Sequence, residues 1–222
     1  MPTRVPSYVA GGRREPRAAE AHPVYDPATG ETIAELPWST PAEIDQAVAA
    51  ARAACRDWAE TPVPDRAQVL FRLKALLEER FEDLAAQVTQ ENGKTLAEAR
   101  GEVRRGIEVV DFACGAPTLL QGAALDQVAG GIDEELVRFP VGVVCGVTPF
   151  NFPVMVPLWM IPIALACGNT FVLKPSQQTP LSAMLLAELL ERAGLPAGVF
   201  NVVHGAEGAV GHLLDHPGVD AV

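Results

Sequence analysis

Basic residues are scarce in this sequence. The chain has 17 lysine and arginine residues against 28 aspartate and glutamate residues, which gives a formal net charge of −11 at pH 7. Nucleic-acid phosphates would be repelled by this excess of negative charge. No run of Lys and Arg suggests a local basic patch. We therefore expect no nucleic-acid partner.

Cysteine is also sparse, and its spacing does not suggest a metal site. The four residues are widely separated: Cys55, Cys114, Cys145 and Cys167. None belongs to a Cys-x-x-Cys motif, and the four histidines do not accompany them at metal-ligand spacing. We therefore expect reduced thiols, no metal site and a cytoplasmic protein.

The sequence lacks a signal peptide and an uninterrupted membrane segment. The N-terminus contains arginines, but acidic residues and prolines accompany them and no apolar core follows. The most apolar stretch, residues 141–167, is long enough to raise the question of a membrane span. Four prolines interrupt it: Pro149, Pro153, Pro157 and Pro162. Lipid would leave the interrupted backbone groups without hydrogen-bond partners, so we expect no membrane association.

The first 134 residues mostly have the apolar spacing of helices. Residues 40–43 and 95–98 both have the pattern of a capping box, in which a Thr and a Glu cap a helix start. Another apolar stripe begins near Asp65, with a break near Phe81, and the pair Asn92-Gly93 is typical of a helix end. We predict a mainly helical part over residues 1–134, whose first twenty or so residues are loosely ordered or form short edge strands.

The pattern changes near residue 135 to alternating strands and helices. Apolar runs predict three buried parallel strands at residues 143–147, 170–173 and 200–203. Helices are predicted after each strand, ending near Cys167-Gly168 and covering residues 181–193 and 206–214. Residues 136–139 are expected in an extended hairpin. This β-α-β-α-β-α order predicts an α/β fold, an open doubly wound parallel sheet over residues 135–222.

Ligands of such sheets bind beyond the carboxyl ends of the strands. The loops at those ends cover residues 148–153, 174–180 and 204–206. The usual G-x-G-x-x-G fingerprint of a dinucleotide site is absent. A nucleotide site, catalysis of another kind and a purely structural role are therefore all open interpretations of this edge.

Two polar residues in these loops are candidates for function. Asn151 lies in an apolar loop, where its amide either satisfies a turn or donates to a developing oxyanion. Lys174 ends the second strand, where it is either an ordinary exposed lysine or a ligand of ribose and phosphate oxygens. The residues alone leave both alternatives open.

Several longer motifs carry a resemblance to a known family. They are Pro149-Phe150-Asn151-Phe152-Pro153, Pro157-Leu158-Trp159-Met160, Cys167-Gly168-Asn169-Thr170-Phe171, Leu173-Lys174-Pro175-Ser176 and Glu102-Val103-Arg104-Arg105-Gly106-Ile107-Glu108. Together they resemble the aldehyde dehydrogenase superfamily. The Pro-Leu-Trp-Met segment and residues 102–108 are most similar to the CoA-acylating methylmalonate-semialdehyde branch. The resemblance begins at about Tyr8 and implies a Rossmann-like cofactor domain.

The resemblance also implies a reaction and roles for particular residues. In this branch a cysteine thiolate attacks a semialdehyde and hydride passes to NAD, which leaves a thioester. The acyl group is then carried to CoA, with loss of carbon dioxide. Asn151 would hold the oxyanion. Thr148 and Phe150 would line the nicotinamide side, and Lys174 would bind the adenosine ribose. Arg105 would bind the substrate carboxylate, the alternative being a solvated helix charge.

One position departs from the family pattern. A glutamate that accepts from both ribose hydroxyls usually follows the Lys-Pro-Ser segment, whereas this chain has Gln177, followed by Gln178. A neutral amide still hydrogen-bonds a ribose and does not repel a 2′-phosphate. We therefore expect NAD as cofactor, with NADP tolerated.

The resemblance implies segments beyond Val222. None of the four cysteines has the context of the family's nucleophile, and relatives continue into a catalytic domain. We therefore expect the chain alone to be inactive and the complete protein to be a homo-oligomer, either dimer or tetramer. Two other interpretations stay open, a hydrolytic dehydrogenase for another aldehyde and a truncated, non-catalytic nucleotide-binding remnant.

Overall fold

The protein is described by a computed structural model that covers residues 3–18 and 21–222. Its central sheet has the strand order β3-β2-β10-β9-β8. The strands are β2 (Ser7–Val9), β3 (Gly12–Arg14), β8 (Val143–Val147), β9 (Thr170–Lys174) and β10 (Phe200–Val202). The last three are parallel, as predicted, and β2 joins β10 in the antiparallel direction.

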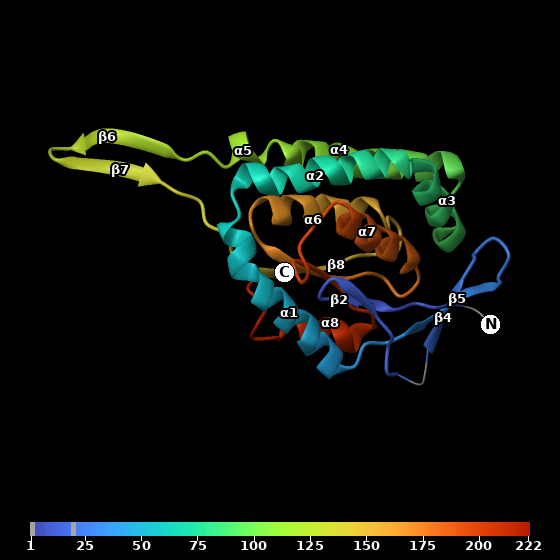
Figure 1. Cartoon of the computed structure of the whole chain (residues 1–222). Coiled ribbons are helices and arrows are strands. Elements are labelled where there is room, and N and C mark those ends of the chain that lie inside the picture. Colours follow the sequence, from blue (N-terminus) through green and yellow to red (C-terminus); the bar gives the residue numbers. More distant parts are fainter. Residues whose placement is uncertain (1–2, 19–20) are drawn as a thin grey trace.

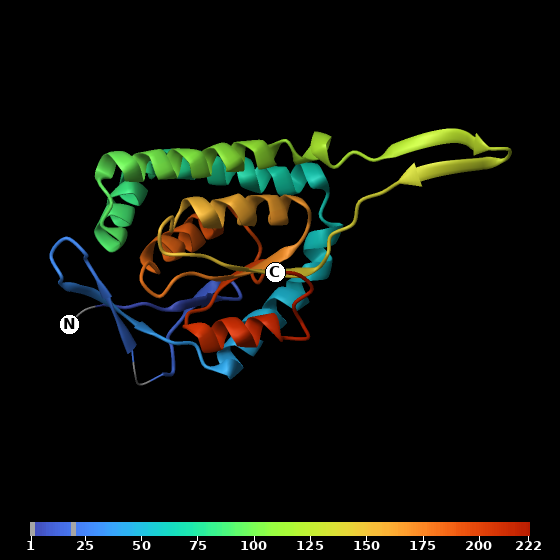
Figure 2. The same cartoon turned by 180° about the vertical axis from the view of Figure 1, so that it is seen from behind.

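Helices cover both faces of this sheet (Figures 1 and 2). Helices α6 (Met155–Ala166) and α7 (Leu181–Arg192) lie on one face, and α1 (Pro41–Glu60) and α8 (Glu207–Leu214) lie on the other. All five residues of β9 are buried, because this strand has neighbours on both sides and helices on both faces. The predicted open, doubly wound α/β fold is therefore confirmed.

The other helices form a layer over α6 and α7. They are α2 (Val63–Glu79), α3 (Phe81–Asn92), α4 (Leu96–Cys114) and the short α5 (Ala116–Leu119). Both predicted capping boxes are present, at the starts of α1 and α4. Gly93 has a φ of 84° directly after α3, as expected for a glycine that ends a helix.

Three short strands and one hairpin lie outside the central sheet. Strands β1 (Thr3–Arg4), β5 (Thr32–Pro37) and β4 (Ala21–Tyr25) form a small sheet in that order. Strands β6 (Ala123–Ala129) and β7 (Ile132–Leu136) form a hairpin that projects from the body with every residue exposed (Figure 1). The helical pattern of the N-terminal part did not predict β4 and β5, and the predicted hairpin at 136–139 ends at Leu136.

The expectation for the first twenty residues is correct only in part. Residues 3–18 contain β1 and β3 at sheet edges, but β2 lies inside the central sheet. Residues 1–2 and 19–20 lie outside the described part of the chain. Within the described ranges, no helix combines the length and apolar character needed to cross a membrane.

Candidate functional site

The loops after β8 and β9 lie side by side at the carboxyl edge of the sheet. The two strands are in register from Val143 opposite Thr170 to Val147 opposite Lys174. The Thr148 backbone N–H then donates to the Lys174 carbonyl at 3.1 Å, which joins the two loops directly. The structure therefore brings together two of the predicted cofactor-binding residues.

Lys174 is almost fully buried, with 5% of its surface exposed. The alternative of an ordinary exposed lysine is therefore wrong. Burial lowers the pKa of Lys174 because a charged ammonium loses water around it. Among the described residues its ammonium has no hydrogen-bond acceptor within range, so it is available to ligand oxygens.

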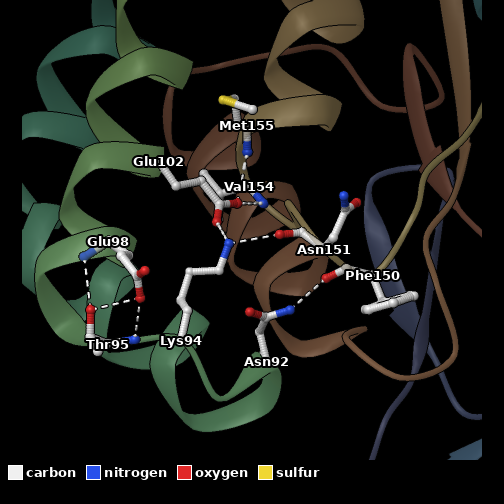
Figure 3. Close-up of polar contacts among 9 residues, drawn as sticks. All are labelled: Asn92, Lys94, Thr95, Glu98, Glu102, Phe150, Asn151, Val154 and Met155. Atoms are coloured by element: carbon white, nitrogen blue, oxygen red, sulfur yellow. Dashed lines mark hydrogen bonds and ion pairs between the residues drawn. The ribbon is translucent and has the colours of Figure 1, made fainter.

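The loop that carries Asn151 is held from one side by the end of α3 and the residues that follow it (Figure 3). The Asn92 side-chain amide donates to the Phe150 carbonyl at 2.8 Å. The Lys94 ammonium donates to the Asn151 carbonyl at 2.7 Å and lies 4.4 Å from the centre of the Phe152 ring. Three successive loop residues thus contact two side chains from a distant part of the sequence.

The Asn151 side chain points away from these contacts (Figure 3). Asn151 is exposed, and within the described ranges its side-chain amide makes no hydrogen bond to a turn. The alternative in which this amide stabilises its own loop therefore has no support. The amide is positioned to donate to a ligand.

Glu102 is a buried carboxylate behind the same loop, and its side chain is 1% exposed. One oxygen accepts from the backbone N–H groups of Val154 and Met155, at 2.9 and 3.2 Å. These groups lie at the start of α6, which has no capping side chain of its own. The other oxygen accepts from Lys94 at 2.5 Å.

Arg105 lies in a cavity of about 380 Å³ beside the Asn151 loop. The cavity is lined by Lys94, Glu98, Gly101, Glu102, Arg105, Phe152 and Met155. The neighbouring Arg104 is paired with Glu78 at 2.5 Å. Arg105 has no such carboxylate among the described residues, so its guanidinium is free to bind an anion in this cavity.

Two of the remaining predicted residues line a second cavity. Phe150 and Gln178 line a space of about 370 Å³ together with Glu91 and residues of β4. Burial raises the pKa of Glu91 to about 7, although its carboxylate accepts the N–H groups of Leu181 and Ser182 at the start of α7. Gln177 is partly buried but lines neither cavity.

Sequence reasoning did not single out Lys94, Glu102 or Asn92 as site residues. Glu102 was noted only as part of a family segment, and Asn92 only as part of a helix-end pair. The ion pair of Lys94 and Glu102 produces no periodic pattern in the sequence. Its role can be recognised only once the structure shows that α4 lies against the Asn151 loop. His204 was likewise treated as a loop residue, but it is fully buried after β10.

His204 is held in its neutral form. Its Nε2 donates to the Pro6 carbonyl at 2.9 Å, and Nδ1 is buried without a partner among the described residues. Burial lowers the pKa of His204 to about 4, and the charge of Lys174 contributes in the same direction. This histidine is therefore an uncharged part of the sheet edge at neutral pH.

One group of side chains elsewhere has metal-ligand chemistry. Asp45 Oδ1 lies 2.6 Å from His212 Nε2 and 3.3 Å from His216 Nε2. The Gly218 N–H donates to His216 Nδ1 at 2.9 Å, so in a neutral ring Nε2 carries the hydrogen and donates it to Asp45. These hydrogen bonds satisfy the group without an ion, and the absence of a metal site stays a prediction.

Comparisons with known proteins identify the class to which this fold and site belong. The model of the aldehyde dehydrogenase family matches residues 14–222. Malonate-semialdehyde dehydrogenase 1 of Geobacillus thermodenitrificans is 55% identical over 216 residues, which is 97% of this chain and 45% of the relative. The chain belongs to the aldehyde dehydrogenase family.

Within the family, the chain is similar to semialdehyde dehydrogenases. The malonate-semialdehyde dehydrogenase of Bacillus pumilus is 52% identical over 97% of this chain and 44% of its own length. The crystal structure of methylmalonate-semialdehyde dehydrogenase from Oceanimonas doudoroffii has a TM-score of 0.95 and 45% identity, covering 99% of this chain and 44% of that one. The chain spans about 45% of the length of the curated relatives it matches.

Proposed function

We propose that the chain provides the cofactor-binding part and the oxyanion-binding amide of an NAD-dependent dehydrogenase for malonate or methylmalonate semialdehyde. The observation that carries this proposal is the free Asn151 amide, in a loop that a backbone hydrogen bond joins to the end of β9, where Lys174 is buried. The similarity to malonate-semialdehyde and methylmalonate-semialdehyde dehydrogenases supports the substrate class.

The proposed chemistry begins with a cysteine thiolate that attacks the aldehyde carbon. The Asn151 amide donates to the oxygen that becomes negative, which lowers the barrier because the donor is already in place. When bound, NAD supplies the hydride acceptor. The acyl group, held as a thioester on the cysteine, loses carbon dioxide and is then transferred to the sulfur of CoA, which releases the cysteine thiolate.

The residues present fit a dinucleotide. Lys174 offers a buried ammonium to ribose oxygens, Thr148 and Phe150 lie on the adjoining loop, and Gln177 and Gln178 follow Lys174. A relative from Sinorhizobium meliloti, described as a methylmalonate-semialdehyde dehydrogenase and complexed with NAD, has a TM-score of 0.96 and 40% identity over 99% of this chain and 45% of its own. We propose NAD as the cofactor, with NADP tolerated.

The nucleophile is proposed to come from outside these residues. Burial raises the pKa of Cys114, Cys145 and Cys167, which disfavours the thiolate. None of the four cysteines lines the cavities beside the Asn151 loop. We therefore propose that the chain alone does not oxidise aldehydes.

The assembly and location are also proposals. We propose a cytoplasmic homo-oligomer, either a dimer or a tetramer. The fully exposed β6–β7 hairpin supports the oligomer, because an isolated two-stranded hairpin is marginally stable in water without a partner.

Asn151→Ala in the full-length protein tests the central role. We expect kcat to fall by about 100- to 1,000-fold, the usual effect of losing one oxyanion donor, with the Kd for NAD unchanged. Gln68→Ala removes an exposed amide from α2 and serves as a control with unchanged kcat. An Asn151→Ala enzyme with the wild-type kcat would refute the proposed role.

The substrate class is tested at Arg105. Arg105→Leu is expected to raise KM for malonate semialdehyde by about 10- to 100-fold, since a charge-assisted hydrogen bond contributes about 1.5 to 3 kcal/mol. KM for propionaldehyde, which has no carboxylate, should not change. Arg104→Leu is the matched control because Arg104 is paired with Glu78. Equal changes for both substrates would exclude carboxylate binding by Arg105.

A further inference from the structure

A chain of polar contacts links helix α4 to the backbone of Asn151 (Figure 3). It starts at Glu102, which accepts three donors with a side chain that is 1% exposed. Two of these donors are the N–H groups that open α6, and the third is the Lys94 ammonium. The carboxylate therefore fixes both the start of α6 and the position of Lys94.

Lys94 continues the chain of contacts to the loop. Its ammonium lies between the Glu102 carboxylate at 2.5 Å and the Asn151 carbonyl at 2.7 Å. The Phe152 ring covers it at 4.4 Å, and 13% of the side chain is exposed. The ammonium thus holds the peptide group that immediately follows the Asn151 Cα atom.

This position matters for the direction of the Asn151 side chain. A fixed carbonyl fixes the orientation of the backbone around the Cα atom, and the Cβ bond leaves from that same atom. The contacts lie on one side of the loop and the amide on the other (Figure 3). These backbone contacts therefore set the direction in which the Asn151 side chain leaves the loop.

Stability alone does not explain a buried ion pair at this place. Desolvating two charges offsets most of their attraction, so apolar residues of similar size often stabilise a fold as well or better. An ion pair does differ from apolar packing in its directionality. Positional control of the loop is therefore the function that this pair is best suited to serve.

We propose that Lys94 and Glu102 are positioning residues for Asn151, and that their ion pair aims the Asn151 amide at the developing oxyanion. The inference rests on the proposed function, in which Asn151 donates that hydrogen bond. Neither residue touches the reacting atoms in this scheme. Their effect passes through the loop of residues 150–154.

The test uses Lys94→Met in the full-length enzyme, which removes the ammonium and keeps an apolar stem. We expect kcat to fall about 10- to 100-fold, the effect of a small misplacement of a catalytic group, with KM for the aldehyde and the Kd for NAD unchanged. Lys94→Arg should recover much of the lost activity. Lys74→Met is the matched control, because Lys74 forms a surface ion pair with Asp111 far from the loop.

A double-mutant cycle separates positioning from general damage. If Lys94 acts through Asn151, Lys94→Met should have little further effect on kcat in an Asn151→Ala enzyme. Hydrogen exchange of the backbone amides of Val154 and Met155, which donate to Glu102, should rise in Lys94→Met and stay unchanged in the Lys74 control. An equal fall in kcat in both backgrounds, or unchanged exchange in the loop, would overturn the proposal.

Failure of the proposed function has a different signature. In that case Asn151→Ala retains the wild-type kcat, whatever happens at Lys94. The exchange measurement still decides whether Lys94 holds the loop, since it does not depend on activity. A local rise in exchange supports the anchoring by Lys94, and no rise refutes it.

Discussion

Arg66 provides a sharp test of what holds the helical layer to the sheet. It is 5% exposed, and within the described part of the chain its guanidinium donates only to backbone carbonyls: Ala166 at 3.0 Å, Trp58 at 3.4 Å, Ala59 at 3.1 Å and Thr61 at 2.6 Å. Three of these carbonyls lie at the end of α1 and the fourth ends α6. One side chain therefore caps the negative ends of two helices.

Arg66→Met should remove these bonds while keeping most of the apolar stem. A buried carbonyl that loses its donor costs about 1–3 kcal/mol. The Trp58 carbonyl keeps the Thr61 N–H at 3.2 Å, and a cavity of about 620 Å³ beside Arg66 admits water to part of the site. We therefore expect a net loss of about 2–4 kcal/mol in the free energy of unfolding.

Arg66→Lys should recover little of this loss. Burial already lowers the pKa of Arg66, yet a guanidinium stays charged in proteins. A lysine in the same place has fewer fixed donors, and burial without a carboxylate partner favours its neutral form. The arginine is therefore required for its geometry as well as its charge.

Urea unfolding followed by circular dichroism measures the effect. With an m-value of about 3 kcal/mol/M, the expected loss lowers the midpoint by about 1 M. Arg56→Met is the matched control, because Arg56 forms an exposed i,i+4 pair with Glu60 that should contribute little to stability. If Arg66→Met and Arg56→Met shift the midpoint equally, the four carbonyls are adequately solvated and the reasoning is wrong.

Three further predictions address packing, pH and cofactor choice. In α4, Gly106→Ala should lower the free energy of unfolding by about 1 kcal/mol in urea, because the new Cβ would meet Leu158 Cδ1 at 2.7 Å. A Cβ at Gly101 of the same helix meets nothing within 4 Å, so Gly101→Ala should stabilise the protein by up to about 1 kcal/mol. Equal effects at both glycines would contradict this reasoning. The pKa of His204 is lowered from 6.5 to about 4, so the unfolded chain binds more protons between those values and stability should fall by about 3 kcal/mol as pH drops through that window. His204→Gln should lack this part of the pH dependence of unfolding, and an unchanged slope would assign it to another group. Gln177→Glu in the full-length enzyme should weaken NADP relative to NAD in affinity measurements, because a carboxylate repels a 2′-phosphate, and unchanged discrimination would end that explanation.

Local patterns were sufficient to predict much of the fold. The runs at 143–147, 170–173 and 200–203 are mostly apolar without alternation because their strands are largely buried on both faces, and the structure has parallel strands there. Thr40 and Thr95 cap their helices through bonds within three residues, so the sequence contains every partner needed to predict them.

Strands with distant partners were not predictable in the same way. Tyr8 of β2 pairs with Val202, and the strand acquires its place inside the sheet only from that pairing. Likewise β4 and β5 depend on each other and on β1, and their short segments lack a clear alternating pattern. Long-range pairing therefore decided where these segments went.

The candidate site was likewise predictable only in part. The family motifs around Asn151 and Lys174 drew attention to the carboxyl edge of the sheet, where the structure places both residues, and their roles stay predictions. The motifs did not indicate that Lys174 is buried, that the Asn151 amide is free, or that Arg105 shares a cavity with the loop. Each of these properties depends on what neighbouring elements leave exposed.

The sequence by itself determined the alternation of strands and helices, the helix starts and the family, because these depend on residues close together in the chain. Only the tertiary structure decided how Lys94 and Glu102 hold the backbone of Asn151. The physical reason is that burial and directional contacts arise where distant segments meet. In the sequence, Lys94 cannot be distinguished from an ordinary surface lysine. In the structure its ammonium is a fixed hydrogen-bond donor, because α4, α6 and the loop enclose it.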